Sequence, residues 1–367
     1  MRKYALALSS LLLFGGAVKA QEEQVFSVVS SVPIVLYGGA SGGYFWTDTY
    51  QTKDNEEDQL QVSNALFGLT GKFGNQIKLG FDVAVGTVLV PHFFNAGQTD
   101  PVSYDFTANS VSNTGFGLIW GYATFEPYAG ITAEAGVIPT KVGYELPATY
   151  ANPNVLLGVV WTAQPVIYEG FRLNFDLNEM AGVPVAFYAE YNQEYNGDNW
   201  GVGFSFGLPD LGVIQDLTVA INYMDYANVD QAAWLNKNIL DFVLNFSLPF
   251  LEAGLNFDYH WLDDRSKQQG RDDNAYGVAL YVAPHFTLAQ GKLTFPIRFE
   301  YFDEGTSGIF TGCEKDNSGW TFTFTPTYKP TPNTYLRLEY AYIDTDQHVL
   351  DGDNNRTVIS AEIGFSF

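Results

Sequence analysis

Apolar and polar residues alternate with a period of two along most of the chain. The C-terminal segment shows this most clearly, because every second residue from Ile359 to Phe367 is apolar and the residues between them are polar or Gly. Successive side chains of a β-strand point to opposite faces, so this segment predicts a strand with one apolar and one polar face. The same alternation recurs in segments such as 293–301 and 335–342.

About sixteen segments follow this pattern, each near the roughly 9–11 residues that a tilted membrane-spanning strand requires. The segments that begin at 35, 60 and 116 alternate less regularly than the others. No helical periodicity of useful length interrupts them. The predicted strands are 35–47, 60–73, 77–88, 116–126, 129–138, 165–177, 183–193, 199–208, 216–226, 238–248, 252–262, 274–285, 291–302, 318–328, 333–344 and 356–367.

The connections between these segments differ in length in a regular way. Short turns alternate with long polar loops, as in outer-membrane β-barrels, which have short periplasmic turns and long external loops. An even number of strands also places both chain ends on the periplasmic side. The short turns are 74–76, 127–128, 249–251 and 330–332, and the long loops are 48–59, 89–115, 138–164, 263–273, 303–317 and 345–355.

A soluble β-sandwich or propeller would also contain many short strands. In this chain, however, aromatic residues repeat on one face of nearly every predicted strand, and water is a poor solvent for such a band. Lipid accepts this band on the outside of a closed barrel. The pattern therefore predicts an all-β fold, a transmembrane antiparallel β-barrel of about 16 strands similar to the general porins, over residues 34–367.

The N-terminus indicates export. Arg2 and Lys3 precede the uncharged apolar stretch 4–18, and Ala20 ends a motif that signal peptidases cleave. The apolar stretch is short for a transmembrane anchor. We therefore expect a cleaved signal peptide at residues 1–20, a short periplasmic segment at 21–33 and a location in the outer membrane of a Gram-negative-type bacterium.

Composition supports this assignment and narrows the partners. Removing residues 1–20 takes away three of the 18 basic residues and none of the 41 acidic ones, which leaves a formal net charge of −26. Such an excess repels nucleic acid. Aromatic residues form 16% of the chain although its mean hydropathy is only −0.05. The single Cys313 can form no internal disulfide, and its role in a predicted external loop stays open.

Two groups of residues resemble known outer-membrane proteins. Ile363, Phe365 and the terminal Phe367 are similar to the C-terminal signature that the barrel-assembly machinery recognises. Segments 136–145 and 164–173 resemble the OmpL-like family of large outer-membrane β-barrel porins. The resemblance implies a barrel embedded in outer-membrane lipid with a porin role, and it does not identify the permeant.

Strand number and loop length predict the form of the channel. Sixteen strands enclose an aqueous lumen unless something plugs it, and segment 21–33 is too short for a plug domain. We expect loop 138–164, which carries Glu145, to narrow the lumen, with loop 89–115 as the competing candidate. The residues expected to line the pore are Lys78, Asp82, Glu134, Glu145, Arg172, Glu190, Asp241, Asp258, Arg298, Glu300, Arg337 and Glu339.

The basic residues of the pore have two interpretations. Arg298 and Arg337 lie on alternate strands, about 10 Å apart. Facing an acidic loop, they would create a transverse field that sorts small polar solutes. They could instead form ion pairs along the wall, for example between Arg298 and Glu339.

The predicted function is passive diffusion of ions and small hydrophilic solutes with a modest preference for cations. A non-conducting structural or adhesin barrel and a substrate-selective channel remain alternatives. We expect no enzyme, no cofactor and no metal, because the four histidines form no catalytic or metal-binding pattern and the acidic runs 344–346 and 351–355 lack the spacing of a calcium loop. A homotrimer would require one lipid-facing sector to become a protein interface, and the pattern does not single one out.

Overall fold

The computed structural model describes residues 25–27, 33–53, 55–97, 102–106, 110–113, 115–194, 197–226, 237–262 and 270–367. The predicted signal peptide, 1–20, and most of the predicted periplasmic segment, 21–33, lie outside these ranges. Among the described residues, no helix combines the length and the apolar composition needed to cross a membrane.

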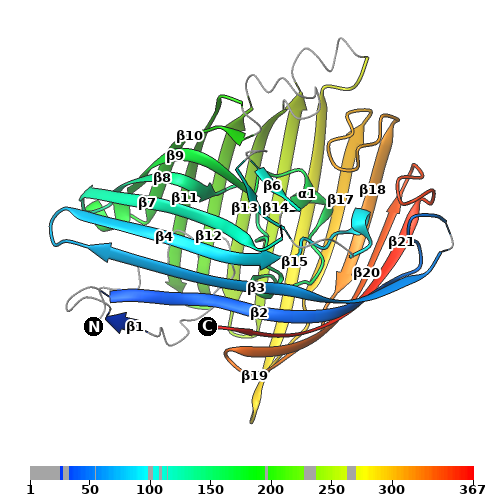
Figure 1. Cartoon of the computed structure of the whole chain (residues 1–367), viewed down its shortest axis with the longest axis horizontal. Coiled ribbons are helices and arrows are strands. Elements are labelled where there is room, and N and C mark those ends of the chain that lie inside the picture. The colour runs from blue at the N-terminus through cyan, green and yellow to red at the C-terminus, as the bar shows by residue number, and fades with distance from the viewer. Residues whose placement is uncertain are drawn as a thin grey trace.

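Sixteen antiparallel strands close into a barrel, and each hydrogen-bonds to its neighbours on both sides (Figure 1). The short β1 (Val25–Ser27) pairs with the first barrel strand. The barrel strands are β2 (Pro33–Thr47), β3 (Glu57–Phe73), β4 (Lys78–Val88), β7 (Gly117–Tyr128), β8 (Ile131–Pro139), β9 (Ile167–Asp176), β10 (Val185–Asn192), β11 (Asn199–Leu211), β12 (Ile214–Asp225), β13 (Lys237–Leu248), β14 (Leu251–Leu262), β15 (Asn274–Leu288), β17 (Ile297–Gly305), β18 (Asn317–Phe324), β20 (Thr334–Thr345) and β21 (Asn355–Ser366).

The barrel closes where its first strand meets its last. β2 and β21 pair from Gly39 opposite Ser366 to Thr47 opposite Val358. The backbone N–H of Phe367 donates to the Gly38 carbonyl at 2.9 Å, and the N–H of Gly38 donates back at 2.9 Å. Closure pairs each of the sixteen barrel strands on both sides, which is the condition for a sheet to reside in lipid.

The predicted fold class and all sixteen predicted strands are confirmed, but two strands are interrupted. Segment 291–302 divides into β16 (Gly291–Thr294) and β17, and segment 318–328 divides into β18 and β19 (Thr327–Thr331). Pro296 and Pro326 occupy the breaks, and proline has no N–H to donate to a neighbouring strand. The prediction of uninterrupted strands is therefore wrong at these two places.

The alternation places apolar side chains on the outer face of the barrel. Leu338 is 61% exposed and Phe299 is 45% exposed, whereas the intervening Glu339 and Arg298 are buried. The outward residues of the other strands follow the same rule, among them Phe125, Phe187, Ile221 and Leu280. A surface of this kind matches the hydrocarbon core of a bilayer.

The short connections contain one element that the pattern did not predict. Between β9 and β10 lies the five-residue helix α2 (Leu177–Ala181). The side chain of Asp176 caps it by accepting from the backbone N–H groups of Asn178 and Glu179. Gly182 then ends the helix in a left-handed conformation that favours glycine.

Two long loops turn back into the barrel and carry short elements. The loop after β4 contains the 3₁₀ turn η1 (Phe93–Asn95) and the hairpin of β5 (Ser103–Asp105) and β6 (Ser110–Ser112). The loop after β8 contains the 3₁₀ turn η2 (Thr149–Ala151) and the one-turn helix α1 (Val159–Thr162). Figure 1 shows β6 and α1 within the ring of strands.

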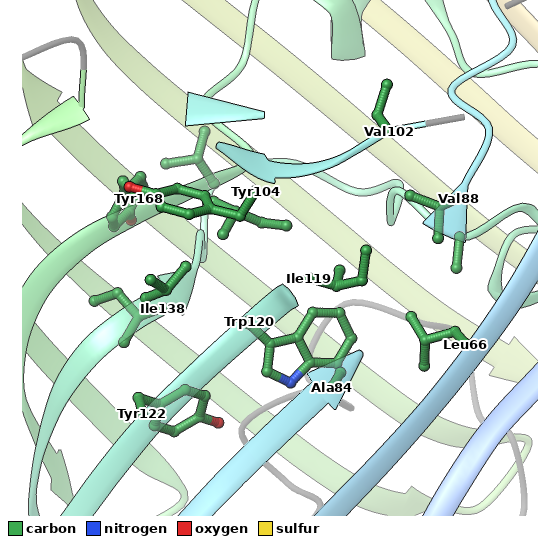
Figure 2. Packing of buried hydrophobic residues seen from close by; sticks show 14 of the residues in the cluster. Leu66, Ala84, Val88, Val102, Tyr104, Ile119, Trp120, Tyr122, Ile138 and Tyr168 are labelled. Atoms are coloured by element: carbon green, nitrogen blue, oxygen red, sulfur yellow. The ribbon is translucent and has the colours of Figure 1, made fainter. Parts of the chain in front are cut away.

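The inside of the barrel is less polar than the alternation predicts. Near the long-loop ends of the strands, Phe45, Phe302 and Ile343 point inward and pack against Phe93 and Leu156 of the two loops. A second apolar cluster, drawn in Figure 2, joins inward residues of β3, β4, β7 and β8 to residues of the loop after β4. In this part of the barrel, side chains of the two loops therefore pack directly against inward-facing residues of the wall.

Candidate functional site

The charges predicted to line the pore lie on the inner wall or on the loop inside it. Most of these side chains are buried, since inward-folded loops and neighbouring wall residues cover them; Lys78 is the partly exposed member. The fully covered members include Asp241, Asp258, Arg298 and Glu300. The site is therefore a network of buried charges around the two loops.

Arg298 of β17 forms the centre of this network. Its guanidinium donates to Glu145 Oε1 at 2.6 Å and to the carbonyl of Leu156 at 2.7 Å, both on the loop after β8. It also lies 3.2 Å from Glu300, whose carboxylate accepts from the backbone N–H of Val160. The side chains of this ion pair are fully buried. Arg298 of the wall and Glu145 of the loop are thus in direct contact as an ion pair.

The backbone at the start of α1 can lie against the Glu300 carboxylate because residue 158 is glycine. A Cβ atom at Gly158 would lie 2.2 Å from Glu300 Oε1. The N–H of Gly158 donates to Glu145 Oε2 at 2.6 Å, immediately before α1 begins. Glu145 thus joins the start of the loop, the start of α1 and the barrel wall.

Arg337 of β20 holds an earlier part of the same loop. It donates to the carbonyl groups of Asn152 and Thr149, each at 2.9 Å. It also pairs with Glu362 of β21, which accepts from the Thr149 hydroxyl at 2.7 Å. Both predicted wall arginines therefore bind the backbone of the loop expected to narrow the lumen.

Glu339 does not pair with Arg298 as the wall interpretation suggested. Its two oxygens accept from the backbone N–H groups of Val155 at 2.5 Å and Leu156 at 2.8 Å. The loop backbone has N–H donors at this position, and the Glu339 carboxylate accepts their hydrogen bonds. Arg298 pairs with Glu145 and Glu300 instead. Sequence spacing identified the wall residues but could not identify their loop partners.

A second group of predicted residues meets on β13 and β14. Asp241 and Asp258 are opposite each other in the pairing of these strands. The Asn256 amide donates to Asp241 at 2.6 Å and to Asp258 at 3.0 Å, and the Gln164 amide donates to Asp258 at 2.7 Å. Gln164 belongs to the end of the loop after β8, so this end is also tied to the wall.

A third group surrounds Arg172 of β9. Arg172 donates to Glu190 at 2.6 Å and to Glu134 at 3.2 Å. Sequence reasoning missed Lys141, whose ammonium donates to Asn174 at 2.7 Å and lies 5.3 Å from the ring centre of Tyr188. Burial and the nearby Arg172 lower the pKa of Lys141 to about 8. The strand pattern gives no signal for this residue because Lys141 lies just beyond the end of β8.

Two predicted residues lie apart from these groups. Asp82 accepts from the Trp120 indole at 2.7 Å and from the Tyr37 hydroxyl. Lys78 pairs with Glu126 near the short-turn end of the barrel, where Lys72 lies 3.0 Å from the same carboxylate. The structure therefore distributes the predicted residues over several local clusters and forms no single ring.

The loop after β4 also enters the barrel and contacts the loop after β8. The N–H of Leu157 donates to the carbonyl of Pro91 at 2.8 Å, and His92 and Leu157 form a parallel β-bridge. Phe93 is fully buried, and its carbonyl accepts from Arg356 at 2.5 Å. The two loops expected to compete for the lumen occupy it together.

The residues of the predicted assembly signal lie on the outer face. Ile363 and Phe365 are exposed, and the Phe367 ring stacks on Phe365. Cys313 is half-buried in the loop after β17, where its N–H donates to the Thr311 hydroxyl at 3.2 Å. In the described part of the chain, no group of three or more His, Cys, Asp or Glu side chains has the arrangement of a metal site.

Comparison with protein families matches residues 34–367 to the family described as "Putative beta-barrel porin-2, OmpL-like". No curated protein matches the chain.

Solved structures with the same fold include three outer-membrane proteins. In vitro folded OmpT, an outer membrane protein of Vibrio cholerae, has a TM-score of 0.60 at 10% identity and covers 94% of this chain and 100% of its own. OmpF of Salmonella typhi in complex with daunomycin has a TM-score of 0.59 at 12% identity and covers 91% of this chain and 98% of its own. The anion-selective porin from Comamonas acidovorans has a TM-score of 0.58 at 11% identity and covers 92% of this chain and 100% of its own. At these identities, the likeness shows the fold alone.

Proposed function

Because the chain belongs to the OmpL-like β-barrel porin family, an outer-membrane channel family, we propose that it forms a narrow water-filled channel for passive diffusion of ions and small hydrophilic solutes. The observation that carries this proposal is the insertion of the loop after β8 into a sixteen-stranded barrel. A barrel of this size encloses a lumen, so the inserted loop sets how wide the passage is.

The charge of the chain supports a modest cation preference. Acidic residues outnumber basic ones by 41 to 18, and acidic runs occupy several of the long loops at the external mouth. A mouth of one sign concentrates ions of the opposite sign. The Comamonas porin shares this fold and is described as anion-selective, so the fold alone does not determine ion selectivity.

Planar-bilayer measurements test both parts of the proposal. Purified protein should produce discrete current steps, and the reversal potential in a KCl gradient should favour K⁺ over Cl⁻. A clear anion preference would refute the selectivity, and a bilayer that stays silent with folded protein would refute the channel.

A substrate-selective channel is the second candidate, and one observation favours it. The inward charges that a wide pore would expose to water are largely covered by the two loops. A narrow passage with a covered wall discriminates between solutes more strongly than a wide one. In the same planar bilayers, a substrate-selective channel would produce small current steps that particular solutes block. Equal permeability to solutes of different chemistry would contradict it.

Export, assembly and oligomeric state belong to the same proposal. We propose cleavage after residue 20, delivery to the barrel-assembly machinery through the C-terminal strand, and a place in outer-membrane lipid. Truncation of Phe367 should lower the folded fraction in outer-membrane preparations. One structural neighbour, OmpT of Vibrio cholerae, is described as a trimer form. Light scattering of the detergent-solubilised protein would reveal whether this chain is also a homotrimer.

We expect no enzymatic activity from this barrel, in keeping with its porin family. Assays for lipase and protease activity on the purified protein would test this expectation. Turnover that co-purifies with the folded barrel would contradict it.

A further inference from the structure

A cavity of about 310 Å³ lies where the two inserted loops meet. It is bounded by the long-loop ends of β4, β7 and β9, by the β5–β6 hairpin and by the segment around α1. This volume is at the lower end of the range of about 300–1,000 Å³ for small-molecule sites. The cavity therefore has the size of a site for one small solute.

One side of the cavity is apolar. Val88, Val102, Tyr104 and Ile119 line it, and Figure 2 shows them as members of the apolar cluster inside the barrel. The indole of Trp161 adds an aromatic surface, while its N–H is already bonded to the carbonyl of Glu145. This wall can pack against a ring or a branched alkyl group but offers little to hydroxyl groups.

The lining also carries polar atoms that have no partner among the described residues. Gln164 is 7% exposed, and its Oε1 accepts no hydrogen bond from the described residues, although its amide nitrogen is bonded. The Nδ1 atom of His92 is likewise buried with no partner among them. Burial and the nearby Arg356 lower the pKa of His92 to about 4, so its ring is neutral at pH 7. Unpaired buried groups of this kind are satisfied when a ligand supplies the complement.

The cavity also contains a negative charge. The carboxylate of Glu194 lines it and is buried, and one of its oxygens accepts from the Tyr226 hydroxyl at 3.0 Å. The cavity thus combines the negative charge of a carboxylate with the Gln164 amide oxygen, an acceptor that has no donor among the described residues. An anionic solute would meet repulsion from Glu194, whereas a protonated amine would find acceptors.

We propose that this cavity is a recognition site for small organic cations, that is, solutes that carry a protonated amine on a compact apolar body. As the selectivity site of a channel, it rests on the proposed function, but binding itself requires no current. The acidic mouth would raise the local concentration of the same solutes.

Calorimetric titration of the purified full-length barrel in nonionic detergent, with detergent alone as blank, tests the site. Benzylammonium chloride is the probe, and sodium benzoate and glucose are the comparators at equal ionic strength. Benzylammonium should bind, and the comparators should bind more weakly or not at all. Absence of benzylammonium binding to folded protein, or tighter binding of benzoate or glucose, would overturn the proposal.

Two variants locate the binding. Glu194→Gln removes the charge without changing shape, and Val111→Phe adds a ring to the lining; each should weaken benzylammonium binding by about tenfold or more. Glu314→Gln removes an exposed external carboxylate, and Val213→Phe enlarges an exposed turn residue, so both controls should bind as the wild type does. Wild-type affinity in both cavity variants, with their folding verified by heat-dependent gel mobility, would overturn the assignment.

Current measurements separate this proposal from the proposed function. If benzylammonium binds and the bilayer stays silent, the channel proposal fails and the site stands. If the barrel conducts and benzylammonium neither binds nor blocks the current, the site fails and the channel stands.

Discussion

The role of a side chain inside the barrel depends more on its hydrogen-bond and ion-pair partners than on its position along a strand. Arg298 and Arg337 lie on the inner wall, as alternation predicts, yet both donate to backbone carbonyls of the loop after β8. Buried charges persist only where opposite charges and hydrogen bonds replace the lost water. These residues therefore hold the loop that we propose narrows the lumen, and removing one of them should release this loop.

Breaking the central ion pair should destabilise the barrel. Arg298→Met leaves Glu145 and Glu300 buried without their cation, which should lower the free energy of unfolding by about 3–5 kcal/mol. Urea titration in detergent measures the change. The matched control is Arg271→Met, which breaks an Arg–Glu pair whose Glu314 is 69% exposed, and it should change stability by about 0–1 kcal/mol. Equal effects of the two substitutions would show that the buried pair does not anchor the loop.

Lys141 should make ion selectivity depend on pH. Its pKa is about 8, so raising the pH from 7 to 9 removes a positive charge beside Arg172 and should increase the preference for K⁺. Reversal potentials at the two pH values measure this change. Lys141→Met should be more cation-selective at pH 7 and lose most of the pH response. Lys53→Met, at an exposed external position, should retain it. A pH response that persists undiminished in Lys141→Met would assign the titration to another group.

Residue-level prediction is possible where a strand fixes the side-chain direction. Asp241, Glu300 and Arg337 could be placed on the inner face because the strand period is two. Lys141 and His92 could not be placed, since loop residues follow no such period. The pairing of Arg298 with Glu145 joins positions 153 residues apart, and no local pattern encodes that contact.

At the scale of elements, the strands were predictable and the loop structure was not. The recurrence of similar segments along the chain located even weakly patterned strands such as β7, and proline explains the breaks before β17 and after β18. The hairpin of β5 and β6 and the helix α1 are too short to produce a periodic signal. The loop after β8 was expected inside the lumen, but the loop after β4 joins it through Leu157 and Pro91.

The contact between the two loops should keep the passage narrow. Phe93→Ala removes a fully buried ring from the apolar cluster that joins both loops to the wall, at a local cost of about 3–5 kcal/mol. We expect larger and noisier single-channel currents. Phe106→Ala truncates an exposed ring in the same loop and should leave the currents unchanged. Indistinguishable recordings from the two variants would mean that the loop after β4 does not restrain the passage.

At the scale of the whole molecule, the closed barrel is the frame, and we propose that the two inserted loops determine what passes through it. A closed ladder with an apolar exterior fits a bilayer without a long helix or a disulfide. Proteins as different as an anion-selective porin and a daunomycin-bound OmpF share this frame at 11% and 12% identity. We therefore expect the selectivity of this chain to depend on the inward loops and the charges that they cover.

Single-channel conductance of a loop replacement tests the central claim that the loop after β8 sets the width of the passage. Residues 144–161, which include most of α1 and most of the contacts to the wall arginines, would be replaced by a short Gly–Ser linker. The replaced barrel should fold and conduct in steps several-fold larger than those of the wild type. Steps of equal size in the two proteins would contradict the account.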